Sequence, residues 1–94
     1  MAERNTWLTD KLKDLAFKRL YLLELCAEAA LTTIDQAAEA AGLTSEALAE
    51  RAGFTTKRLQ ELTRSPTTLT LAALVYLAQA LDLEVVITFK PLRL

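Results

Sequence analysis

The chain has no histidine, one cysteine, two glycines and two prolines among its 94 residues. A lone Cys26 forms no disulfide within one chain, the usual zinc-ligand sets are missing, and no nucleophile stands at a recognisable spacing from a base. So few glycines and prolines leave little room for a β fold with many turns. No apolar run is long enough to cross a bilayer, and residues 1–7 lack the apolar core of an export signal. These absences argue against catalysis, a metal or a cofactor, and favour a cytoplasmic protein.

What is present favours helices. Hydrophobic residues make up 52% of the chain, and alanine, leucine, glutamate and lysine are common. The length suffices for one domain with a modest core. We therefore predict a mainly α fold in a single domain over residues 1–94.

A long first helix is predicted over residues 7–30, with Thr6 as its N-cap. One helical stripe of apolar residues is predicted to face the core: Leu8, Leu12, Leu15, Leu22, Cys26 and Ala29. More apolar residues between Leu15 and Cys26 lie on other faces of this helix, which indicates a second contact surface. The rest of the domain, another copy of the chain and a foreign protein are all compatible with that surface.

Two further helices flank the centre of the chain. Thr33 and Gln36 have capping-box spacing, which predicts a helix over residues 34–41 that stops at Gly42. After the turn-forming residues 65–68, a helix is predicted over residues 70–81. Its core-facing positions are predicted to be Leu71, Leu74, Val75, Ala78 and Leu81.

Residues 45–64 carry the most informative pattern, which predicts two short helices joined by a tight turn. Small or apolar side chains occupy the inward positions: Leu48, Ala49, Ala52, Phe54, Leu59 and Leu62. Gly53 can adopt the positive φ that a helix C-terminus favours, and Thr44 and Thr55 can cap the helices that follow them. The outward positions are polar or charged, so the pattern is that of a helix-turn-helix.

The segment GLTSEALAERAGFTTKRLQEL, residues 42–62, followed by LAQALDLEV, residues 77–85, resembles the phage-repressor (lambda repressor and Cro, or XRE-type) helix-turn-helix family. The resemblance spans about residues 33–83. It implies a bundle of about five helices, in which the second and third form the DNA-reading pair. It also implies a two-fold dimer on a near-palindromic operator. Ser45 stands where the family often has a glutamine that touches the DNA backbone.

Residues in the first turns of a recognition helix face base edges, whereas flanking residues bind phosphate. The predicted base-contacting residues are Thr56, Lys57, Gln60 and Glu61. The predicted phosphate-contacting residues are Ser45, Thr55, Arg58 and Arg64. Charge supports this placement, because residues 51–64 carry four basic side chains against one acidic side chain, although the net charge is −1.

In residues 83–89 every second side chain, counted from Leu83, is apolar. This period of two predicts a β-strand that ends at Pro91. No second strand-like run exists in the chain, so its backbone groups need an outside partner. We expect two copies to pair these strands across a two-fold axis. The predicted dimerisation residues are Leu83, Val85, Val86, Ile87 and Phe89.

The leading hypothesis is a dimeric transcriptional repressor that binds double-stranded DNA. A second hypothesis is an antitoxin-type module that binds and neutralises a protein partner, and this role can coexist in one chain with regulation of its own gene. Residues 21–50 carry six acidic side chains and no basic one, and can cover a basic toxin. A third is a scaffold that kept the fold without DNA binding, which the acidic total charge and Ser45 allow.

Overall fold

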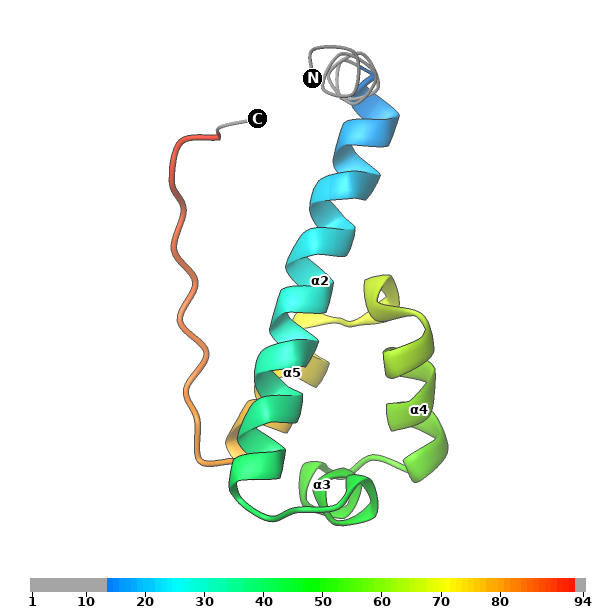
Figure 1. The fold of residues 1–94 in the computed structure, drawn as a ribbon, viewed down its shortest axis with the longest axis vertical. Coiled ribbons are helices and arrows are strands. Elements are labelled where there is room, and N and C mark those ends of the chain that lie inside the picture. The colour runs from blue at the N-terminus through cyan, green and yellow to red at the C-terminus, as the bar shows by residue number, and fades with distance from the viewer. Residues whose placement is uncertain (1–13, 93–94) are drawn as a thin grey trace, which may run out of the picture.

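The computed structural model describes residues 14–92. Within this range the elements are α2 (Leu15–Ala40), α3 (Ser45–Ala52), α4 (Thr56–Arg64), the 3₁₀ turn η1 (Pro66–Thr68) and α5 (Leu71–Ala80). Figure 1 shows α3, α4 and α5 gathered around the C-terminal half of α2, while the N-terminal half projects beyond them. The prediction of a mainly α fold is confirmed. The predicted five helices and C-terminal strand are not supported in the described range.

Threonine side chains begin three of the helices. The Ala47 amide donates to Thr44 Oγ1 (3.1 Å), the Arg58 amide to Thr55 Oγ1 (3.0 Å), and the Ala73 amide to Thr70 Oγ1 (3.0 Å). Each bond satisfies an amide that has no partner inside its helix and stabilises the helix by about 1 kcal/mol. The caps expected at Thr44 and Thr55 are confirmed, Thr70 caps the helix that was predicted to start there, and the three bonds fix where α3, α4 and α5 begin.

Gly53 ends α3 in the left-handed conformation, with φ 78°. The Phe54 amide then donates to the Ala49 carbonyl at 2.8 Å, which closes the last turn of α3 and directs the chain into α4. The positive φ expected at this glycine is confirmed. Gly53 therefore sets the angle at which α4 leaves α3.

Replacing Gly53 with alanine should lower the free energy of unfolding by about 1 kcal/mol. A Cβ at this position would meet no atom within 4 Å, so the loss comes from the backbone conformation alone. Gly53→Asn should lose less, because asparagine tolerates the left-handed region better than alanine. Urea unfolding of the three proteins measures both effects, and equal stability of Gly53→Ala and the wild type would contradict this explanation.

The core lies where the C-terminal half of α2 meets the other helices. Leu62 and Leu77 are fully buried, each with 0% of its surface exposed. The remaining buried members of this cluster are Leu31, Ile34, Ala38, Leu48, Ala49, Leu59 and Ala78. The prediction that Leu48, Ala49, Leu59 and Leu62 face inward is confirmed, and Ala52 and Phe54 pack at the edge of the cluster.

The predicted break between two helices near residues 31–33 is wrong, because α2 continues through it to Ala40. Thr33 does not act as a cap: its hydroxyl donates to the Ala29 carbonyl at 3.0 Å, as in a helix interior. Among the described residues, Asp14 caps α2. The predicted cap Thr6 and the predicted start at Trp7 lie outside the described residues. None of the helices in this range combines the length and apolar content that crossing a bilayer requires.

Two predicted helix faces also need correction. In α2 the buried positions are Ala27, Leu31, Ile34 and Ala38, whereas Leu15 is 59% exposed and Cys26 and Ala29 are also exposed. The rest of the described chain covers only the C-terminal half of α2, so it does not bury the predicted stripe, of which Leu22 is half-buried. In α5 the predicted core position Ala78 is buried, and Leu74 and Leu81 pack against the core cluster as predicted. Leu71 and Val75 are exposed, however, and Ala73 and Leu77 are buried instead. Leu8 and Leu12 lie outside the described residues.

The C-terminal segment (residues 83–92) forms no strand within the described chain. It follows α5 and runs back along α2 as an extended chain (Figure 1). Val85 packs against the core cluster, but the backbone beyond Leu83 has no ladder partner among residues 14–92. A strand requires a hydrogen-bonded neighbour, and the described part of one copy supplies none.

Candidate nucleic-acid interface

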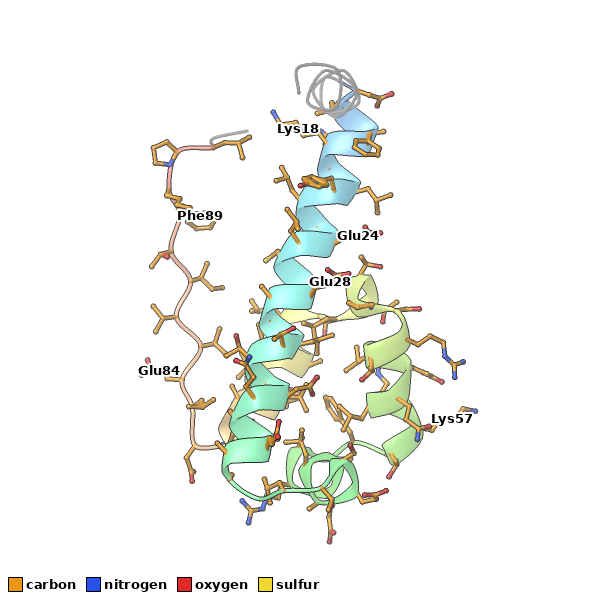
Figure 2. All side chains as sticks on the ribbon, viewed as in Figure 1. Lys18, Glu24, Glu28, Lys57, Glu84 and Phe89 are labelled. Carbon is orange, nitrogen blue, oxygen red and sulfur yellow. The ribbon has the colours of Figure 1, made fainter. Side chains whose placement is uncertain are left out.

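The exposed face of α4 is polar along its whole length. Lys57, Gln60, Glu61 and Arg64 are exposed and have the spacing i, i+3, i+4 and i+7, which places them on one side of a helix. Leu59 and Leu62 point the other way and are 8% and 0% exposed. Figure 2 shows Lys57 extending outward from α4, away from α2. Three of the four predicted base-contacting residues therefore share one open surface with Arg64.

The two leucines hold α4 against the rest of the domain. α4 packs against α3 and η1, and Ala49 of α3 is 1% exposed within the same cluster. A side chain as small as alanine allows a neighbouring helix to approach closely. The polar face of α4 is consequently presented by a rigid support, which a surface that recognises a ligand needs.

Thr56 and Arg58 lie at the edges of this face, where each is half-buried. The Arg58 guanidinium is 4.0 Å from the Glu61 carboxylate, an i, i+3 ion pair with 40% and 50% of the two side chains exposed. A pair at this separation and exposure stabilises a helix by only about 0.3 to 0.5 kcal/mol. Both side chains can therefore leave the pair for a ligand at little loss.

The two remaining predicted contacts stand at helix N-termini. Ser45 is the first residue of α3 and Thr55 is the N-cap of α4, and both are exposed. Amides in the first turn of a helix lack partners within it and favour an anion. The structure thus places these hydroxyls where a phosphate oxygen can also reach helix amides. Ser45 additionally lines an indentation that contains Asp35 and Glu39.

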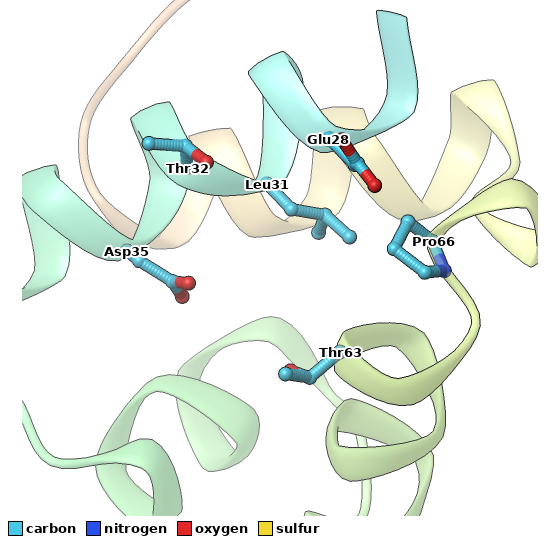
Figure 3. Close-up of a pocket in the computed structure, with 6 residues that line it drawn as sticks. All are labelled: Glu28, Leu31, Thr32, Asp35, Thr63 and Pro66. Atoms are coloured by element: carbon cyan, nitrogen blue, oxygen red, sulfur yellow. The ribbon is translucent and has the colours of Figure 1, made fainter. Parts of the chain in front are cut away.

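A shallow groove separates α4 from α2. One open indentation of about 310 Å³ is lined by Glu28, Leu31, Thr32, Asp35, Thr63 and Pro66 (Figure 3). Its neighbour shares Asp35 and Thr63. Glu28 and Asp35, the carboxylates on the α2 side, repel anions, so this groove disfavours a phosphate-bearing ligand. The groove sets a negative boundary beside the positive residues of α4.

Thr63 is a residue that the sequence analysis missed. It lines both indentations, and its hydroxyl donates to the Leu59 carbonyl at 3.2 Å. It lies seven residues after Thr56, so both threonines share one edge of α4. That spacing is visible in the sequence. The location of α2 across from this edge is not, because it depends on how the bundle packs.

Neither a metal-binding cluster in the described residues nor a match to a known protein gives further evidence of function. The described residues contain no group of three or more Cys, Asp or Glu side chains placed to hold a metal ion. Comparisons of the chain with protein-family models, with curated proteins and with solved structures give no match. The function proposed below therefore rests on the geometry of α3 and α4 and on the sequence.

Proposed function

We propose that this protein is a sequence-specific DNA-binding regulator, acting as a dimeric repressor that inserts α4 into the major groove. The observation that carries the proposal is the polar face of α4, with Lys57, Gln60, Glu61 and Arg64 exposed on a capped helix anchored by two buried leucines. A helix of this width fits the major groove, where each base pair has a distinct pattern of donors and acceptors. The protein acts by binding, with no catalytic step and no cofactor.

The side chains on this face match base edges in their hydrogen-bonding chemistry. Lys57 donates to the O6 and N7 acceptors of guanine, Gln60 forms a bidentate pair with adenine, and Glu61 accepts from cytosine N4. Thr56, at the edge of the face, contacts the thymine methyl group or a base acceptor. Each good pair contributes about 1 to 3 kcal/mol of discrimination between bases.

Phosphate contacts orient α4 on the duplex. Arg64 in the last turn and Arg58 at the edge of α4 hold the backbone by charge, and Ser45 and Thr55 bind it at helix N-termini. When Arg58 turns to a phosphate, its weak ion pair opens and Glu61 is free for a base. DNA binding thus uses both members of that pair.

The resemblance to phage repressors supports the same function and extends it to two copies. A two-fold dimer places two α4 helices on half-sites about 34 to 36 Å apart, and such a site is a near-palindrome. Occupying an operator in the cytoplasm excludes the transcription machinery from the promoter. The C-terminal segment is the proposed contact between copies.

A second function, that of an antitoxin, is favoured by a different surface. The N-terminal half of α2 exposes leucines, and the acidic side chains of α2 and α3 are exposed too. A basic toxin fits such a surface by charge and by apolar contact. Co-purification of the chain with the product of an adjacent gene, and loss of that protein's toxicity on co-expression, would support this role.

A mobility-shift assay with the DNA upstream of the protein's own gene tests the regulator. We expect a shift that survives excess random duplex. A protein that binds no duplex would instead be a scaffold with the fold alone.

Arg64→Ala should weaken binding to specific and random duplexes alike, and should reduce the slope of log K against log salt by about 1, because one phosphate contact is lost. Arg19→Ala is the matched control, since it removes the same charge from an exposed position on α2. Titrations at several salt concentrations measure both variants. A loss confined to the specific duplex would contradict the assignment of Arg64 to phosphate.

A further inference from the structure

The C-terminal segment has unpaired backbone groups and exposed apolar side chains. At the start of the segment, the Leu83 amide donates a hydrogen bond to the Ala78 carbonyl (2.8 Å). Residues 84–92 make no hydrogen bond to another backbone group within the described chain. Val86, Ile87 and Phe89 are 73%, 57% and 94% exposed. An extended apolar edge of this kind is a template for pairing with another strand.

This edge lies beside a second apolar surface. The segment begins beside the C-terminal half of α2 and extends in the direction of the N-terminal half, which projects from the bundle (Figure 1) and exposes Leu15, Leu20, Leu23 and Leu25. The radius of gyration is 16.0 Å, compared with about 12 Å for a compact chain of this length. Both apolar surfaces therefore belong to the part of the molecule that its own core does not cover.

The segment has two distinct sides. Side chains alternate along an extended chain, so Val85, Ile87 and Phe89 share one side and Glu84, Val86, Thr88 and Lys90 share the other. Val85 packs against the core cluster. Figure 2 shows Glu84 pointing away from α2 and Phe89 on the side that faces α2. The apolar side thus faces the protein and the charged side faces outward.

One antiparallel register matches this segment to a second copy of itself. In an antiparallel pair, two directly opposed residues have their side chains on the same side of the sheet. If the two-fold axis that relates the copies passed between two residues, residues from the apolar side of one copy would be opposed to residues from the charged side of the other. An axis through Ile87 pairs Val85 with Phe89, Val86 with Thr88, and Glu84 with Lys90 of the other copy. Moving the axis to Val86 would place Lys90 opposite Asp82, which has φ 57° and cannot continue a strand.

We infer that a second copy of this chain occupies the C-terminal segment in an antiparallel ribbon centred on Ile87, with Glu84 of each copy opposite Lys90 of the other. The inference rests on the homodimer of the proposed function and specifies its interface. The ribbon pairs the backbone groups on the facing edge of each copy.

Charge exchange tests the register. Glu84→Lys and Lys90→Glu each place like charges opposite one another twice in the dimer, and each variant should dimerise about tenfold more weakly than the wild type. In an equimolar mixture of the two variants every facing pair is again of opposite sign, so a heterodimer should form with wild-type affinity. Sedimentation without DNA measures the dissociation constants, and native mass spectrometry identifies the heterodimer. Both residues are exposed, so the fold remains intact.

Cysteine crosslinking locates the axis independently. With Cys26 replaced by serine, Ile87→Cys should form a disulfide between copies under mild oxidation, because the residue faces its own counterpart. Val86→Cys is the matched control and should crosslink less. Preferential crosslinking at position 86 would overturn the register.

Other outcomes of these measurements are equally decisive. A wild-type chain that sediments as a monomer at tens of micromolar would overturn the interface, and would indicate that the segment folds onto its own α2 or binds a different protein. Weakening by each variant without recovery in the mixture would overturn the Glu84–Lys90 pairing. None of these measurements contains DNA, so their failure would leave the DNA-binding assay to be judged separately.

Discussion

Leu62→Ala is expected to lower the free energy of unfolding by about 3 kcal/mol. Leu62 is fully buried and lies between α4 and the rest of the core cluster, so truncation removes buried apolar surface and leaves a cavity. The fold around it is small, and a loss of this size is a large fraction of the stability of such a domain. Urea unfolding at a fixed protein concentration measures the change, since the proposed dimer would make the midpoint depend on concentration.

Leu71→Ala is the matched control for this experiment. Leu71 is a leucine at the start of α5, but 58% of its surface is exposed. Its truncation should lower the free energy of unfolding by less than about 1 kcal/mol. Equal losses for Leu62→Ala and Leu71→Ala would mean that the core is not where the structure places it.

Replacing Lys57 and Gln60 together with alanine is expected to weaken binding to the specific duplex by more than about a hundredfold, and binding to random duplex much less. Two base contacts of about 1 to 3 kcal/mol each are removed, while the phosphate contacts remain. Both side chains are exposed on α4, so stability should be unaffected. Competition titrations with specific and random duplexes at one salt concentration measure the two affinities.

Lys18→Ala with Gln79→Ala is the matched control, because it removes the same two side-chain types from α2 and α5. Figure 2 shows Lys18 on the projecting half of α2, far from α4. The control should bind both duplexes as the wild type does. Parallel losses of specific and random binding in the Lys57 and Gln60 variant would contradict the proposed division between base and phosphate contacts.

The parts of the fold that the sequence predicts correctly depend on local chemistry. Thr44, Thr55 and Thr70 cap helices through bonds to amides three residues later, and Gly53 ends α3 because it adopts a positive φ. These features depend on neighbouring residues only. The spacing of Leu59 and Leu62 likewise predicts which side of α4 is buried.

The incorrect predictions concern features that local sequence does not decide, because they depend on which of two structures is more stable or on contacts with other elements. Thr33 has a capping-box pattern, but no glycine or proline interrupts the surrounding helix, and a continuing helix wins over a cap. α5 is apolar on nearly all sides and Gln79 is its single strongly polar residue, so the sequence pattern identifies its exposed face poorly, and packing against α3 decides that Leu77 is buried. The strand over residues 83–89 fails within the described chain because a strand depends on a partner.

The candidate site also combines features set by neighbouring residues with features set by packing. Lys57, Gln60, Glu61 and Arg64 share a face because of their spacing, which the sequence alone provides. The ion pair between Arg58 and Glu61 and the acidic groove beside Thr63 depend on side-chain reach and on the position of α2. The sequence therefore predicts which residues can meet DNA, while the fold determines from which side.

Selection of bound duplexes from a random pool, at about 0.15 M salt, tests the central claim that the outward face of α4 recognises base edges. Wild-type protein should recover two inverted half-sites about 10 base pairs apart. The variant lacking Lys57 and Gln60 side chains should lose the preference at the guanine and adenine positions of each half-site. Recovery of an unchanged random pool by the wild type, or of the same half-sites by the variant, would contradict this claim.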